Sequence, residues 1–207
     1  MCVPYHIIAF SIVITRLDYC NAVWYGITGK NIIQLQRVQN SLARVVCAAS
    51  FRSPSALLLH SLHWLPIRHK ITHKVATLTF KALHHRQPSY LYQLLNIYSS
   101  SCQLRSSGAG LPVKPETSNK TSDRAFSVVA ATTRNRLPPK VRTATTNEQF
   151  SRALKTYLFT LDWSWLSPAP LTRHFHWWIM APFTNWVTDW LIDVMISTHP
   201  YGDQLIR

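Results

Sequence analysis

The acidic side chains of this chain are few and scattered, which argues against metal-dependent phosphoryl chemistry. The sequence contains 8 aspartates and glutamates, and no two of them are adjacent. Two-metal phosphoryl transfer needs paired carboxylates, because the metal ions stabilise both the attacking and the leaving oxygen. The sequence also contains no Tyr-x-Asp-Asp turn. We therefore expect no catalytic residues and no cofactor.

Ten histidines and four cysteines raise the question of a metal site. His60 and His63 are three residues apart, and His69 and His73 are four apart. Zinc needs three or four ligands, and no cysteine or acidic residue follows closely enough in sequence to complete either pair. Since His69 and His73 share a helix face with Phe80, we predict a second packing surface there and no metal site.

Nucleophilic catalysis has no sequence signal either. The chain contains no Gly-x-Ser-x-Gly element, and its five glycines form no phosphate-binding loop. Many serines could be combined with a histidine and an aspartate, but nothing in the sequence selects one. We predict that the chain is not an enzyme.

Basic side chains are the residues that indicate a function. The net charge is +14, and it is unevenly placed: residues 1–162 carry 20 basic and 5 acidic side chains, whereas residues 163–207 carry 2 and 3. A positive field of this size attracts polyanions, of which nucleic acid is the commonest in a cell. We predict that the backbone of RNA or DNA is a partner. A basic surface without any ligand is the alternative.

Two arginines lie on a helix predicted over residues 31–48. Apolar residues recur there at spacings of three and four, namely Ile32, Leu35, Val38, Leu42 and Val45. Arg37 and Arg44 lie off this stripe, two helical turns apart, with Gln36 and Asn40 near them. Guanidinium groups suit phosphate oxygens, and amides can reach the sugar or backbone, so we predict nucleic-acid contact. A solvated helix face is the alternative, favoured most for Gln36.

Three lysines lie on a second helix, predicted over residues 67–85 and starting after Pro66. Lys70, Lys74 and Lys81 fall within about 40° of one another on a helical wheel, next to the apolar stripe of this helix. Lysine stems can cover apolar surface while the ammonium groups stay in water, so this edge suits phosphate contact. A solvated edge without a ligand is again the alternative.

The two helices should pack against each other, with Trp64 covering the join. The residues predicted to make this contact are Leu35, Val38, Leu42, Ile71, Val75 and Leu78. Further helices are predicted over residues 125–136 and 147–161, the second capped by Thr146 or Asn147. Strand-like alternation is poor, and residues 97–124 are rich in serine, proline and glycine. We therefore predict a mainly α fold, an irregular helical assembly with a central loop.

Six sequence blocks, taken in order, carry a resemblance to a known family. They are TRLDYCNAVWYG (15–26), LQRVQNSLARVV (35–46), LHWLPIRHKI (62–71), PSYLYQLL (88–95), DRAFSVVA (123–130) and FSRALKTYLF (150–159). In this order and at these separations, they resemble the thumb and post-polymerase C-terminal region of reverse transcriptases from jockey-like retrotransposons, which are long interspersed elements without long terminal repeats. The resemblance covers about residues 11–161.

The resemblance implies that this region positions template and primer and does not make bonds. It also implies that the region packs against a polymerase palm in the parent protein, and we expect no complete palm here. One position departs from the family pattern, because Arg134 stands where tryptophan is expected before the Asn-x-Leu-Pro run. The substitution should leave either a cavity or a buried cation, each costing several kcal/mol if the position is enclosed.

The resemblance and the composition together divide the chain into four parts. These are a helical thumb-like region (1–96), a linker or loop (97–124), a C-terminal helical region (125–162) and a tryptophan-rich tail (163–207) outside the resemblance. Proline and aspartate interrupt the apolar stretch over 175–197, so we predict no membrane-spanning segment. We expect an intracellular protein, nuclear or cytoplasmic, in which the thiols remain reduced.

We therefore predict a non-catalytic fragment of a retrotransposon reverse transcriptase that binds nucleic acid without sequence preference. The alternative is an inert or host-recruited interaction protein with no nucleic-acid role; a host-recruited protein would use the aromatic tail.

Overall fold

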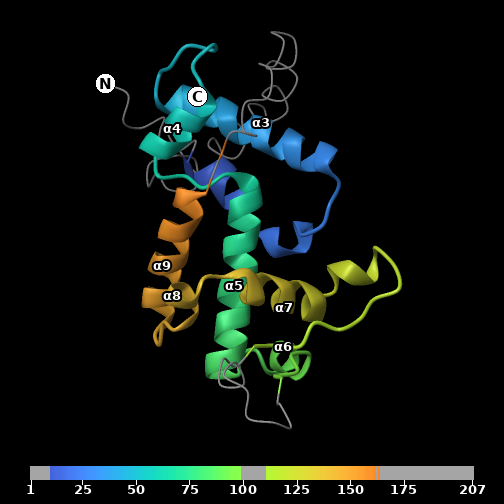
Figure 1. Cartoon of the computed structure of the whole chain (residues 1–207). Coiled ribbons are helices and arrows are strands. Elements are labelled where there is room, and N and C mark those ends of the chain that lie inside the picture. The colour runs from blue at the N-terminus through green and yellow to red at the C-terminus, as the bar shows by residue number, and fades with distance from the viewer. Residues whose placement is uncertain (1–9, 99–110, 162, 164–207) are drawn as a thin grey trace, which may run out of the picture. The chain divides into compact units, whose positions relative to one another are not determined.

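The computed structural model describes residues 10–98, 111–161 and 163, and these residues are mainly α-helical (Figure 1). The helices are the π-helix η1 (Phe10–Ile14), α2 (Thr15–Asp18), the 3-10 helix η2 (Asn21–Trp24), α3 (Gly29–Val46), α4 (Ser55–Ser61), α5 (Ile67–His85), α6 (Ser89–Gln93), the 3-10 helix η4 (Ser122–Arg124), α7 (Phe126–Arg136), α8 (Pro139–Arg142) and α9 (Asn147–Thr160). Within these residues no strand forms, although an isolated antiparallel bridge joins Ile97 to Pro112. The mainly α fold class is therefore confirmed.

Contacts divide the chain into two units, Met1–Pro168 and Ala169–Arg207, and the second lies outside the described residues. The central helix of the first unit is α5. Helix α9 packs along it, α7 crosses it, and α3 and α6 also contact it (Figure 1). Phe80 of α5 stacks on Phe150 of α9, with ring centroids 4.4 Å apart. His69 and Phe80 are both buried, so the predicted second packing surface of α5 is confirmed.

Helices α3 and α5 share one buried cluster near the start of α5. The cluster contains Leu42, Ile67 and Ile71, with Leu35 and Trp64 packed against it. Trp64 also packs against the cluster formed by α5 and α9, so it covers the join as predicted. Val38, Val75 and Leu78 lie outside the shared cluster. For Val75 and Leu78 the reason is that α7 and α9 cover the later turns of α5. That part of the predicted contact is wrong.

The buried face of α3 is more polar than the sequence pattern predicted. Val45, assigned to the apolar stripe, is 47% exposed, whereas Gln36 is only 2% exposed. The Gln36 side chain accepts a hydrogen bond from the Ile67 backbone N–H (2.9 Å) and donates to Gln39 Oε1 (2.9 Å) and Asn40 Oδ1 (2.8 Å). The solvated face that was the alternative for Gln36 is wrong, because these amides satisfy one another and the first N–H of α5.

A second set of contacts from α3 holds the same turn. Gln39, which is fully buried, donates its side-chain N–H to the Leu65 carbonyl at 2.9 Å. Pro66 is the N-cap of α5 and offers no side-chain hydrogen bond of its own. Gln36 therefore satisfies the N–H of the first residue of α5, and Gln39 satisfies the carbonyl of the residue before Pro66.

Arg134 of α7 is a buried cation, which is one of the two outcomes that its place in the sequence predicted. The residue is 6% exposed, and its guanidinium carbon lies 5.9 Å from the Phe80 ring centroid and 5.7 Å from that of Phe150. Its Nη2 donates to the Arg142 carbonyl at 3.1 Å. Burial lowers the pKa of Arg134, and Arg142 adds to the effect. Aromatic faces and one carbonyl thus compensate the charge only in part, because the buried Nη1 has no hydrogen-bond partner among the described residues.

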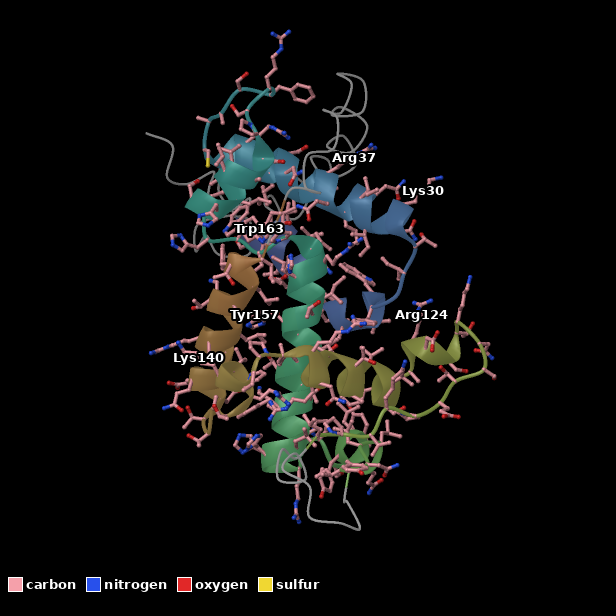
Figure 2. All side chains as sticks on the ribbon, in the orientation of Figure 1. Lys30, Arg37, Arg124, Lys140, Tyr157 and Trp163 are labelled. Carbon is pink, nitrogen blue, oxygen red and sulfur yellow. The ribbon has the colours of Figure 1, made fainter. Side chains whose placement is uncertain are left out.

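Trp163 belongs to the helical core, although the tail was predicted to begin at this residue. Its ring is buried and packs against Phe159 and His60, and its indole N–H donates to the Leu158 carbonyl at 3.3 Å (Figure 2). It also faces His69 of α5 at 6.3 Å between ring centroids. Trp163 therefore packs with the helical region that precedes it, and the rest of the tail lies outside the described residues.

Candidate nucleic-acid interface

The five basic residues predicted to contact nucleic acid do not form one site. Lys70 and Lys74 line a common cleft of about 430 Å³, whereas Arg37, Arg44 and Lys81 are not among its lining residues. The cleft lies beside α2, α5 and α9 and the turn that precedes α5. A residue that the sequence did not single out, Lys155 of α9, brings a third lysine to it.

The helices explain why these lysines converge. Lys70 and Lys74 lie one turn apart on α5, so they project from one side of it. Phe150, Leu154 and Leu158 of α9 are buried in the cluster that holds Phe80 of α5. That packing brings Lys155, which follows Leu154, to the edge of the α5 surface. The sequence predicted both helices but contained no signal for how they would face each other.

Lys70 is already paired with an acidic side chain. Its Nζ lies 2.9 Å from Asp18 Oδ1 and 3.3 Å from Asp18 Oδ2. The Lys70 side chain is 13% exposed and that of Asp18 is 44% exposed, so the carboxylate is on the solvent side of the pair. Asp18 is the last residue of α2, so the pair joins α2 to α5. Lys74 and Lys155 are the two lysines of the cleft that make no ion pair with another described residue.

His73 lies between these charges and the core. Its Nε2 is 3.4 Å from Ser151 Oγ of α9. Burial lowers the pKa of His73; the Ser151 contact opposes this shift, Lys155 and Lys74 add to it, and Asp18 opposes it weakly. The imidazole is therefore neutral at pH 7, and the positive field that acts on it comes from the lysines of the cleft.

The contact between Ser151 and His73 joins α9 to α5. Ser151 lies inside α9, so its backbone N–H is engaged in the helix and cannot serve as an oxyanion donor. No group of three or more histidine, cysteine or acidic side chains with metal-binding geometry occurs in the part of the chain that the structure describes. His60 and His63 pack instead near Phe159.

The two arginines of α3 have different surroundings. The Arg44 Nη2 donates to the Ser53 carbonyl at 3.3 Å, and its guanidinium lies 5.7 Å from the Phe51 ring centroid. Burial lowers the pKa of Arg44. Arg44 therefore holds the loop after α3. Arg37 is half-buried and extends from α3 (Figure 2), and Lys81 is exposed on α5.

A second cleft, of about 490 Å³, lies on the other side of α5. It is lined mainly by apolar residues, including Val23, Tyr25, Val75, Phe126 and Val129, with Arg124 as its basic residue. The Arg124 Nε–H donates to the Tyr25 carbonyl at 3.3 Å, so this side chain joins η4 to the turn after η2 (Figure 2). The basic cleft is the better candidate for an anionic ligand.

Comparison of the chain with protein-family models, with curated proteins and with solved structures found no match. Among the described residues, no helix has the length and apolar character needed to cross a membrane.

Proposed function

We propose that this chain binds the backbone of RNA or DNA without catalysis, in the manner of the thumb and post-polymerase region of a retrotransposon reverse transcriptase. The observation that carries the proposal is the convergence of Lys70, Lys74 and Lys155 on one cleft. The six sequence blocks support the family assignment, and the +14 net charge supports a polyanionic partner.

The chemistry of the cleft suits binding more than reaction. Lysine ammonium groups contact phosphate as point charges and carry no base preference, so binding should be indifferent to sequence. Asp18 is the acidic residue that lines the cleft, and its oxygens contact Lys70. A lone carboxylate in that position provides no paired site for two metal ions. We therefore propose that the chain has no polymerase, nuclease or hydrolase activity, and that it acts in the nucleus or cytoplasm.

Salt dependence provides the test. The fluorescence anisotropy of a labelled RNA 20-mer should rise on addition of the full chain at low ionic strength. Each neutralised phosphate releases counterions, so log K should fall linearly with log salt at a slope of about −0.7 per phosphate on a single strand. A salt-independent affinity, or no binding at low ionic strength, would contradict the proposal.

Exposed apolar side chains favour a second candidate, a protein-interaction role without nucleic acid. Tyr19, Val23, Leu57 and Tyr90 are each more than half exposed. Exposing large apolar side chains to water is unfavourable, and a partner protein that buries them gains free energy, especially where they form a patch. This candidate predicts concentration-dependent self-association or partner binding and no response to RNA. Sedimentation with and without the RNA 20-mer separates the two candidates.

A further inference from the structure

We propose that the cleft between α5 and α9 holds one nucleotide of a single strand, with its phosphate near Lys74 and Lys155 and its base against Trp64. The inference rests on the proposed function and narrows it from any nucleic-acid backbone to single strands with accessible bases.

The first argument is the size and lining of the cleft. A volume of about 430 Å³ is within the range of small-molecule sites and far larger than a phosphate group requires. Its lining is also mixed, with Ile14, Trp64 and Leu65 beside the three lysines. A ligand that fills such a cleft needs an apolar planar part as well as an anionic part. A nucleotide has both.

The second argument is the fixed position of Trp64. This ring packs against two buried clusters, one shared by α3 and α5 and the other by α5 and α9. An aromatic ring held in this way loses little conformational entropy when a ligand stacks on it. Base–aromatic stacking is also tolerant of sequence, because every base has a π-face. Binding through Trp64 therefore remains compatible with sequence indifference.

The third argument is the distribution of charge in the cleft. Asp18 neutralises Lys70, so an entering phosphate is attracted to Lys74 and Lys155 and repelled by the carboxylate. The Asp18 oxygens can instead accept hydrogen bonds from a sugar hydroxyl or an exocyclic amine. The cleft thus offers both unpaired cations and a carboxylate, which suit different parts of a nucleotide. A paired base is stacked inside its helix and cannot enter, which is why duplexes should bind less well.

The experiment compares a labelled single-stranded RNA 12-mer with its duplex at the same salt concentration, using the full chain. The single strand should bind at least tenfold more tightly. Trp64→Leu should weaken single-strand binding roughly tenfold and leave duplex binding unchanged, whereas Trp64→Phe should retain most of it. Asp18→Asn, which keeps an oxygen toward Lys70 but removes a negative charge, should tighten binding of inorganic phosphate.

Competition makes the test independent of whether Trp64→Leu folds. Adenosine monophosphate should displace the RNA from the unmodified chain at a concentration at least tenfold lower than inorganic phosphate does. Equal competition by the two, together with equal affinity for single strand and duplex, would overturn the nucleotide site while leaving salt-dependent backbone binding intact. Absence of salt-dependent binding to either RNA would overturn both proposals.

Discussion

Gln36 should contribute more to stability than any exposed polar residue of α3, and Gln36→Met tests this directly. Methionine matches the length of glutamine and its helix propensity, so the substitution removes hydrogen bonds without leaving a large cavity. Three groups lose their partner: the Ile67 N–H, Gln39 Oε1 and Asn40 Oδ1. Gln39 and Asn40 are themselves buried, so water cannot replace the lost contacts without rearrangement.

The magnitude follows from the cost of leaving buried polar groups unsatisfied. Each such group costs about 1–3 kcal/mol, and the gain from burying an apolar thioether offsets part of the total. We expect the free energy of unfolding to fall by roughly 3 kcal/mol. Urea unfolding followed by circular dichroism measures this change as a lower midpoint with an unchanged m-value.

Gln34→Met provides the matched control, because Gln34 has the same side chain on the same helix and is exposed. It should change the free energy of unfolding by less than about 0.5 kcal/mol. If Gln36→Met is as mild as the control, the buried amide network does not hold the start of α5, and our account of the α3 face is refuted.

Three further changes test other local features. Gly26→Ala should destabilise the fold by about 1–3 kcal/mol in thermal unfolding, because Gly26 has a φ of +72° and an added Cβ would lie 2.9 Å from Arg124 Cγ. Gly29→Ala is the control: its added Cβ would meet nothing within 4 Å, so it should be neutral or stabilising. Thr146→Ala should cost about 1 kcal/mol, since the Thr146 hydroxyl accepts from the Gln149 N–H at the start of α9; an unchanged midpoint would show that this cap contributes nothing. Burial, and to a lesser degree Arg68, lowers the pKa of His69 from 6.5 to about 4. Between these two pH values the unfolded chain therefore binds more protons than the folded chain. The contribution of His69 to the free energy of unfolding should be fully present above pH 6.5 and fall by up to roughly 3 kcal/mol as the pH drops to 4. Urea titrations at each pH should show a smaller loss for His69→Gln.

The long helices could be predicted from the sequence because their apolar periodicity is strong. The helix predicted over 67–85 has the same bounds as α5, and the one predicted over 31–48 is displaced by two residues from α3. The predicted Thr146 cap is also present. Short helices such as α4 and α8 were not predicted, because a turn or two of chain is too little for a periodic signal.

The candidate site could be predicted only in part, because tertiary contacts decide which charges meet. The lysine edge of α5 was visible from spacing, but Asp18 is 52 positions from Lys70 and no local pattern links them. Lys155 was missed for the same reason. A solvated face was the alternative for Gln36 because polar side chains are normally exposed, but its satisfied hydrogen bonds allow Gln36 to be buried.

The most direct test of the central claim compares two double variants that remove the same charge. Lys74→Gln with Lys155→Gln removes the two unpaired lysines of the cleft, and Lys140→Gln with Arg152→Gln removes two exposed basic side chains that do not line it. The measurement is the salt dependence of binding to the single-stranded RNA 20-mer. We predict that the first double variant makes the slope of log K against log salt shallower by about 1.4 and that the second leaves it unchanged. Equal slopes for the two double variants would show that the net charge alone binds RNA and that the cleft is not the site.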